Sequence, residues 1–520
     1  MSKLTKITAI ILTLAMLFTM VGCGGDDGDK NDQKTEGKYD VVSYMTEVDG
    51  RQVVYHNGKP FFFNAVHLRY DHLVRVLDTK AEKAMADAMR LIKKNGFETV
   101  IIYVNWGKIF DGKKYDLSWF TKQFKEAEKN DLKVLINWFG SNVCGFGGYQ
   151  SWQKNDEKKY PCLIDSTTGM PVLGTGLASG NKIPDFSAPA FFEDESKALS
   201  LICDWLYEND KDRRTVALQI CDEPNNAEGG YGQWMSQFKN YADYMDKLGS
   251  VVKNSKYPMV TYTVLMGTGY NDTIDGYTYK QRVKYLIDLP NLDFVGYSIY
   301  EPTTSPKFKD LEQDGNMPVM IGLNPASWVT PAQALYCITN AYGYCHYQFI
   351  NYDESDGGYY SMFGNKVDGT VFGERTGEKL LTNGEFAGHL EVDHKEVVNM
   401  NTSIFKMDEL IATNKEKNMA VFNNKAKNDV DTKKTIDNEK IYFTYKNTDK
   451  QYGACGMMLK ANDGNFYGFA TLNSTYTFTS DITVTEGHYE GGKWISEGEV
   501  NVKDKSFTAE AGKTYQIVIK

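Results

Sequence analysis

The sequence predicts an α/β chain, with a (β/α)8 TIM barrel followed by a C-terminal antiparallel β-sandwich. Eight short apolar runs alternate with amphipathic helical segments, which is the pattern of a parallel barrel. No glycine-rich phosphate turn follows the first run, and this favours the barrel over the alternative, a doubly wound open sheet. Beyond Asn414 the pattern changes to short alternating runs separated by turns, as in a sandwich.

Each strand of the barrel is predicted from a run of apolar residues. After a short leading strand at 52–55, the eight barrel strands are expected at 61–66, 99–104, 134–138, the run that begins at Thr215, 259–265, 292–300, 319–322 and 346–352. Helices are expected at 80–95, after a cap at Asp116 or Ser118, and at 192–207, 233–253, 279–289, 331–342 and 395–412. Residues 144–189 form a long insertion, and the sandwich strands include 441–445, 467–472, 476–478 and 514–519.

The amino-terminal residues indicate export. Two lysines and an apolar stretch too short for a membrane span end on Met-Val-Gly-Cys23, which resembles a bacterial lipobox. Residues 1–23 are therefore predicted as a lipoprotein signal, 24–40 as a disordered tether, 41–414 as the barrel and 415–520 as the sandwich. We expect an exported lipoprotein of the bacterial cell membrane, facing outward, with lipidation at Cys23. A secretory signal without lipidation is the alternative.

Composition excludes several function classes. The chain is 42% hydrophobic and 24% charged with a net charge of −10, so nucleic acid is not expected as a partner. Without Cys23, an odd number of cysteines remains and none forms a C-x-x-C pair, which argues against a zinc site or a disulfide framework. The histidines lack metal-ligand spacing. No metal and no cofactor are predicted.

The stretch 215–226 is the centre of the predicted site. Its buried apolar run stops on Asp222 and Glu223, and Pro224 then ends strand pairing because it cannot donate a hydrogen bond. Glu223 would thus lie at the carboxyl end of a strand, where parallel barrels carry their chemistry. The alternative is an exposed Asp-Glu turn after a core strand.

Aromatic and acidic residues recur at the predicted strand ends. Flat aromatic faces suit pyranose C–H groups, and carboxylates supply the proton transfer that glycosidic cleavage requires. An oligosaccharide or polysaccharide is therefore the expected partner. The alternative for any one of these aromatic rings is packing between helices. The strand-end residues are Trp106, Trp138, Asp222, Glu223, Tyr297, Tyr300, Glu301, Tyr347 and Asp353.

Two segments carry a family resemblance across roughly residues 55–412. Residues 103–117 and 133–137 resemble the region of the second and third strands in clan A glycoside hydrolases, most closely families 35 and 42, which contain the β-galactosidases. Residues 219–224 are similar to the fourth-strand motif of these families, in which an Asn-Glu pair carries the acid/base. The resemblance implies that Glu223 is the general acid/base. Asp222 stands where these families have asparagine, and its charge would raise the pKa of Glu223.

The seventh strand departs from the resembling families. They carry a nucleophilic glutamate there, but this chain reads Met320-Ile-Gly-Leu-Asn-Pro325, and residues 315–352 contain no Asp, Glu, Lys or Arg. Either another carboxylate substitutes or hydrolysis has been lost. Glu301 is the preferred substitute because it directly follows a strand run, whereas Asp353 and Glu354 precede a turn typical of solvent-exposed chain.

These observations predict an exported glycoside hydrolase-like protein acting on β-linked glycans, with β-galactosides as one candidate class. The competing hypothesis is a non-catalytic glycan-binding lipoprotein of the cell surface, and a third is an inert barrel scaffold. The predicted catalytic residues are Glu223 and Glu301. The predicted substrate-binding residues are Asp222, Arg69, Asn105, Trp106, Trp138, Tyr300, Asn324 and Tyr347.

Overall fold

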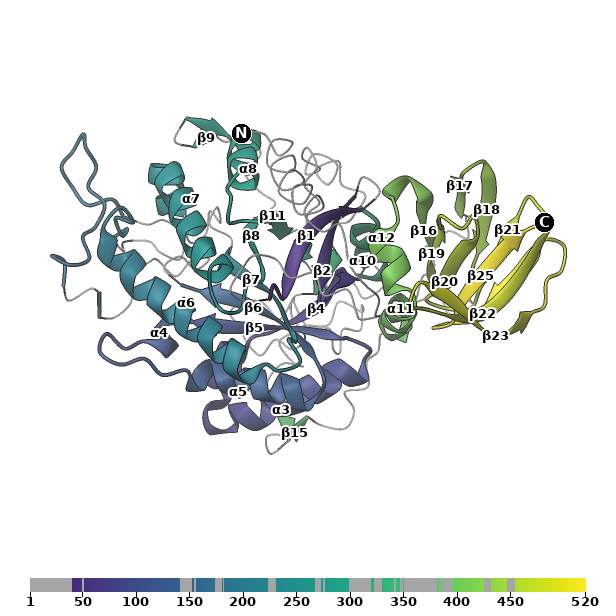
Figure 1. The fold of residues 1–520 in the computed structure, drawn as a ribbon, viewed down its shortest axis with the longest axis horizontal. Coiled ribbons are helices and arrows are strands. Elements are labelled where there is room, and N and C mark those ends of the chain that lie inside the picture. The colour runs from purple at the N-terminus through teal and green to yellow at the C-terminus, as the bar shows by residue number, and fades with distance from the viewer. Residues whose placement is uncertain are drawn as a thin grey trace, which may run out of the picture.

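The computed structural model describes most of the chain beyond the predicted signal and tether. The described residues are 40–48, 51–140, 152–153, 156–173, 180, 182–222, 231–266, 273–274, 276–298, 319–321, 330–340, 343–346, 349, 381–382, 385–386, 395–424, 432–446 and 454–520. A barrel with surrounding helices lies beside a smaller part built of strands, which ends at the carboxyl terminus (Figure 1).

Eight parallel strands form a closed barrel in the order β11-β12-β13-β4-β5-β6-β7-β8. The ring closes where β11 pairs with β8. This confirms the predicted (β/α)8 architecture. The strands are β4 (Phe63–Leu68), β5 (Thr99–Asn105), β6 (Lys133–Phe139), β7 (Thr215–Asp222), β8 (Val260–Met266), β11 (Phe294–Ser298), β12 (Val319–Ile321) and β13 (Gly343–His346).

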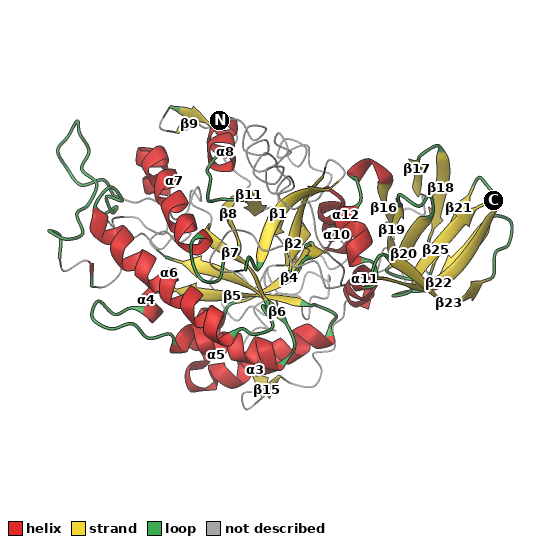
Figure 2. Ribbon diagram, viewed as in Figure 1, coloured by secondary structure: helices red, strands yellow, loops and turns green. Residues whose placement is uncertain are grey.

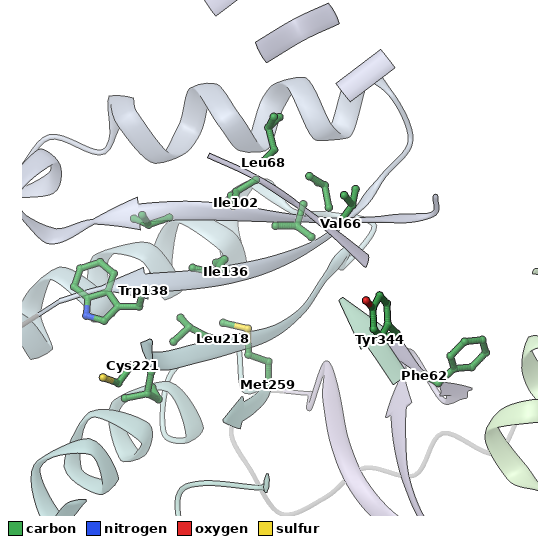
Figure 3. Packing of buried hydrophobic residues seen from close by; sticks show 14 of the residues in the cluster. Phe62, Val66, Leu68, Ile102, Ile136, Trp138, Leu218, Cys221, Met259 and Tyr344 are labelled. Atoms are coloured by element: carbon green, nitrogen blue, oxygen red, sulfur yellow. The ribbon is translucent and has the colours of Figure 1, made fainter. Parts of the chain in front are cut away.

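The barrel strands are buried on both faces because one face points into the barrel and the other meets the helices. Ile101 and Leu135 belong to the cluster that fills the barrel interior. Their neighbours Ile102 and Ile136 belong to the larger cluster between strands and helices, part of which is drawn in Figure 3. Period-two alternation on a doubly covered strand explains why these runs are apolar throughout.

Helices cover the outside of the barrel (Figure 2). The helix α3, for example, buries Met85, Ala88, Met89 and Ile92, the apolar face expected from the sequence. The helices are α2 (Tyr70–Leu77), α3 (Ala81–Lys94), α4 (Trp106–Ile109), α5 (Ser118–Lys129), α6 (Pro189–Asn209), α7 (Tyr231–Lys253), α8 (Tyr279–Ile287), α10 (Thr330–Asn340), α11 (Lys395–Phe405) and α12 (Asp408–Thr413), with a 3-10 turn η1 (Asp78–Lys80) between α2 and α3.

A small antiparallel sheet lies at the amino-terminal end of the barrel strands. It comprises β1 (Ser43–Val48), β2 (Arg51–His56) and β3 (Lys59–Phe61). The hydroxyl of Ser43 accepts from the backbone N–H of Val260 at 2.8 Å and donates to the backbone carbonyl of Val216. These bonds join the sheet to β7 and β8 at the end of the barrel opposite Asp222.

The eighth strand lies earlier in the chain than predicted. The sequence suggested 346–352, but β13 spans Gly343–His346. Gly343 starts the strand with φ of 146°, and a Cβ there would lie 1.9 Å from the carbonyl oxygen of Phe63 on β4. Only glycine allows two strands to approach so closely in that conformation. The prediction was wrong because the requirement for Gly343 comes from the neighbouring strand β4 and leaves no apolar run in the local sequence.

The C-terminal part consists of two packed antiparallel sheets, as predicted. One sheet has the order β16-β19-β20-β25-β22-β23 and the other β17-β18-β21-β24, so β23 and β17 are edge strands. Side chains such as Phe443, Tyr476 and Phe507 fill the space between the sheets. The strands are β16 (Met419–Asn424), β17 (Thr432–Ile436), β18 (Glu439–Thr444), β19 (Ala454–Lys460), β20 (Phe466–Ala470), β21 (Ser474–Phe478), β22 (Ile482–Glu490), β23 (Lys493–Val500), β24 (Ser506–Ala509) and β25 (Thr514–Ile519).

The sandwich shares a core with the barrel. On β19, Met458 faces the second sheet, whereas Met457 and Leu459 join the cluster that surrounds the barrel strands. Polar contacts reinforce this packing, because Asn399 Nδ2 on α11 donates to the carbonyl of Thr471 at 2.9 Å. The strands β19 and β20 of the six-stranded sheet are therefore buried on both faces.

Candidate functional site

Four neighbouring strands bring polar groups to one end of the barrel interior. β4, β5, β6 and β7 pair side by side and in parallel, so their carboxyl ends meet at one rim. Arg69 follows β4 directly, while Asn105, Phe139 and Asp222 are the last residues of β5, β6 and β7. Three predicted site residues, Arg69, Asn105 and Asp222, thus lie at the same end of adjacent strands.

Arg69 is held rigidly in this end of the barrel. Its guanidinium carbon lies 4.4 Å from the ring centroid of Tyr103 and 5.1 Å from that of Phe139. Its Nε and Nη2 donate to the two carboxylate oxygens of Asp71 at 2.9 and 2.6 Å. Burial by itself would raise the pKa of Asp71, but the charge and hydrogen bonds of Arg69 lower that pKa to about 2.

Asp222 is a buried carboxyl group on the interior face of β7. The pairing of β7 with β8 shifts between Gln219 and Cys221, and this irregularity puts Gln219 and Asp222 close together. Gln219 Nε2 donates to Asp222 Oδ1 at 2.7 Å. Burial raises the pKa of Asp222 above its ordinary value, opposed by the charge of Arg69 and the side-chain amides of Gln219 and Asn137.

A buried histidine lies one layer deeper. His67, two residues before Arg69 and on the same face of β4, shares a hydrogen bond of 2.6 Å between its Nδ1 and the hydroxyl of Tyr103. Burial lowers the pKa of His67 well below its usual range, and Arg69 and His346 lower it further. His67 is therefore neutral at physiological pH and supports the ring that carries Arg69.

Several buried polar atoms in this region have hydrogen-bonding capacity left over. Asn105 Oδ1, Tyr262 Oη and Ser298 Oγ are buried and have no hydrogen-bond partner within the described part of the chain. Burial also raises the pKa of Tyr262 well above its ordinary value, so its hydroxyl stays protonated. Buried polar atoms usually have partners, so this interior suits a polar ligand or ordered water.

The two predicted tryptophan contacts lie on the other side of the barrel wall. Trp106 and Trp138 are both 0% exposed and belong to the cluster between strands and helices. Trp138 Nε1 donates to Glu195 Oε1 on α6 at 2.7 Å, and the hydroxyl of Tyr244 donates to Glu195 Oε2 at 2.6 Å. In this structure neither indole offers a face to a sugar. Neither tryptophan belongs to the proposed site.

The remaining predicted site residues lie outside the described residues. These are Cys23, Glu223, Tyr300, Glu301, Asn324 and Tyr347. Two of them directly follow described strands in the sequence. β7 ends on Asp222, the residue before Glu223, and β11 ends on Ser298, two residues before Tyr300.

The sequence reading missed most of the interior partners. His67, Asn137 and Gln219 each interrupt an otherwise apolar strand run, and each precedes a residue at the rim by two or three positions. When adjacent strands each carry a polar residue at a similar distance from their carboxyl ends, the pattern predicts that these residues share one layer inside the barrel. Asp71 carried no such signal, because its role depends on the turn into α2.

The described residues do not suggest a metal centre or a membrane span. No group of three His, Cys, Asp or Glu side chains in the described ranges could hold a metal ion. None of the described helices combines the length and apolar character needed to cross a bilayer.

Comparison with known proteins gives similarities of fold only. No family profile matches the chain, and no curated protein sequence matches it. Among solved structures it is similar to a GH30 endoxylanase from Clostridium papyrosolvens C71, at 10% identity and a TM-score of 0.41, over 88% of this chain and 95% of that one.

Two further solved structures show similar values. A family 39 glycoside hydrolase from Bacteroides cellulosilyticus WH2 aligns at 13% identity and a TM-score of 0.40, over 90% of this chain and 84% of that one. A β-galactosidase from Rahnella sp. R3 aligns at 11% identity and a TM-score of 0.43, over 68% of this chain and 57% of that one.

Proposed function

We propose that this chain is an exported glycoside hydrolase-like protein that acts on β-linked glycans, with β-galactosides as the first class to test. The observation that carries the proposal is the buried carboxyl group of Asp222 beside Arg69 at the carboxyl end of β7. Buried titratable groups with shifted pKa values cluster at active sites, and parallel barrels carry their chemistry at this end. The unpaired polar atoms of the interior are suited to sugar hydroxyl groups.

Glu223 is the proposed general acid/base, because it follows Asp222 in a segment that resembles the fourth-strand motif of clan A. Burial raises the pKa of Asp222, which favours the neutral form of the carboxyl group next to Glu223. In the neutral form that burial favours, Asp222 would not repel the charge of Glu223, and its carboxyl O–H could donate a hydrogen bond, as the amide of asparagine does in the resembling families.

Glu301 is the proposed second carboxylate. It follows β11, two strands from β7 around the barrel, and no acidic residue occurs in 315–352 to serve instead. That lack of acidic residues is also the observation that favours the alternative function, a cell-surface glycan-binding protein without turnover.

Hydrolysis of aryl β-glycosides separates the two functions. Replacing Glu223 by Gln removes the proton donor without changing side-chain size, and we expect the rate to fall about 10²–10⁴-fold. Asp194→Asn, which alters a carboxylate on the outer helix α6, is the matched control and should keep the wild-type rate. Equal rates in Glu223→Gln and wild type would remove Glu223 from the mechanism. Binding of oligosaccharide without any turnover would favour the alternative.

The same assay tests Glu301. Glu301→Gln should lose turnover, and azide should restore it by taking the place of a missing nucleophile. Unchanged rates in this variant would exclude Glu301 from catalysis.

Export and anchoring complete the proposal. The Met-Val-Gly-Cys23 sequence and the polar stretch after it support a lipid anchor with a tether that lets the folded part face outward.

A further inference from the structure

A groove on the flank of the barrel lies outside the site described above. It runs between α2, η1 and α3 on one side and α4 and α5 on the other, and it encloses about 350 Å³. This volume is at the lower end of the range of about 300–1,000 Å³ typical of small-ligand pockets. The groove is on the helix side of the barrel wall, whereas Arg69 and Asp222 face the interior.

An aromatic pair joins the two sides of the groove, with Tyr70 on α2 and Trp119 on α5. The ring of Trp119 is partly exposed and lies 4.6 Å, centroid to centroid, from the buried ring of Tyr70, with 40° between their planes. Trp119 Nε1 donates to the backbone carbonyl of Tyr103 at 3.1 Å. The indole is thus fixed by β5 and by Tyr70, and a fixed ring loses little conformational entropy when a ligand binds.

Charged hydrogen-bonding groups also line both sides of the groove. Lys122 on α5 and Glu82 on α3 form an ion pair across the groove, with side chains 47% and 59% exposed. The ammonium of Lys108 lies 5.4 Å from the ring centroid of Trp119. The lining contains two cations, Lys108 and Lys122, and two carboxylates, Asp78 and Glu82, so it has no net charge.

This combination selects a class of ligand. A flat, fixed aromatic face beside paired charged donors and acceptors suits a ring that is apolar on one face and carries hydroxyl groups at its edge. A lining without net charge gives no preference to anions or cations. Both properties match a neutral pyranose.

We propose that this groove is a second carbohydrate-binding site, which holds one or two sugar units of a neutral oligosaccharide against Trp119. In the complex the sugar takes the place of the Lys108 ammonium on the indole face, and Glu82 and Lys122 hydrogen-bond its hydroxyl groups. The inference rests on the proposed function only in taking glycans as the ligand class. It requires no catalysis.

The test uses the full chain carrying Glu223→Gln, so that no substrate is turned over. Cellotetraose, xylotetraose, mannotetraose and β-1,4-galactotetraose are titrated in a calorimeter and followed by tryptophan fluorescence. We expect Glu82→Ala/Lys122→Ala to weaken binding of at least one tetrasaccharide tenfold or more, or to lower the stoichiometry by one. The exposed pair contributes little to folding, so this variant should keep the parent's melting temperature.

The control is Lys125→Ala/Glu128→Ala, a second exposed ion pair on the same helix α5, outside the groove lining. It should bind like the parent. Equal affinity and stoichiometry in the groove variant and the control would overturn the second site, whatever the enzyme assay shows. If no tetrasaccharide binds the parent, the second site is also rejected, while hydrolysis by the wild type would still stand for the barrel site.

Discussion

The carboxyl group of Asp222 experiences two opposing influences. Removal from water favours its neutral form, whereas the guanidinium of Arg69 favours its charged form. Arg69 already has a bidentate partner in Asp71, whose pKa it holds near 2. One arginine therefore serves two carboxyl groups of different character, ionised Asp71 and Asp222 with a raised pKa. This is how a barrel site can hold an acid and a base close together.

Asp222→Asn tests this assignment through stability. A carboxyl group whose pKa is raised by folding contributes stability that is fully present below its unfolded pKa and is lost as pH rises through the folded pKa. Asparagine does not titrate. We therefore expect the variant to melt above the wild type at pH 7 and the difference to shrink as the pH falls toward 4.

Thermal unfolding across this pH range measures the effect, and Asp212→Asn, an exposed carboxylate near the other end of β7, is the control. A variant that melts below the wild type at pH 7 would show that ionised Asp222 is stabilised in place by Arg69.

The sequence predicts those site residues that lie at the ends of barrel strands. Arg69, Asn105 and Asp222 were found because each ends an apolar run, and strand ends in a parallel barrel converge. Trp106 and Trp138 also end such runs, but their side chains face outward. Which face a residue takes depends on the strand register, and the irregularity between Gln219 and Cys221 shows that the register is not a simple alternation.

At the scale of elements, the sequence predicts long helices and strands with a regular apolar period. It does not predict features that depend on close contact between two strands. The strand β5 and the helix α3 have the predicted positions within a residue or two, because their apolar period extends over a whole element. The strand β13 was shifted because its first residue, Gly343, is required by close contact with β4 and not by any local pattern. The helix α2 was not predicted.

Gly343→Ala should be strongly destabilising. The new Cβ would lie 1.9 Å from the carbonyl oxygen of Phe63 in a backbone conformation that disfavours side chains, and we expect a loss of about 2–4 kcal/mol in the free energy of unfolding. Urea denaturation measures this loss. In the control Gly169→Ala, the glycine has φ of 69° but no heavy atom within 4 Å of the new Cβ, so about 1 kcal/mol is expected. Similar losses in both variants would mean that β13 and β4 can move apart.

At the scale of the whole molecule, the barrel and sandwich are joined through a shared core. Met457 and Leu459 on β19 pack into the cluster around the barrel strands, and Asn399 on α11 bonds to the sandwich backbone. The barrel and the sandwich therefore pack together as one unit. The predicted tether, residues 24–40, would connect this unit to the proposed lipid anchor.

Cys23→Ala tests the anchor. The wild type should partition into the detergent phase, because its cysteine carries lipid, and the variant should stay in the aqueous phase. Partitioning is measured on protein expressed with its own signal in a bacterial host. The same distribution for both proteins would rule out lipidation at Cys23.

Two of the four edge strands of the sandwich, β23 and β17, carry exposed charge. Glu497 and Glu499 are exposed on β23, and Lys433 and Lys434 are exposed on β17. An open edge can pair with a strand from another molecule, and two copies of the same edge would bring like charges together. Pairing of β23 with β23, or of β17 with β17, is thus disfavoured even where many copies of the chain are crowded side by side.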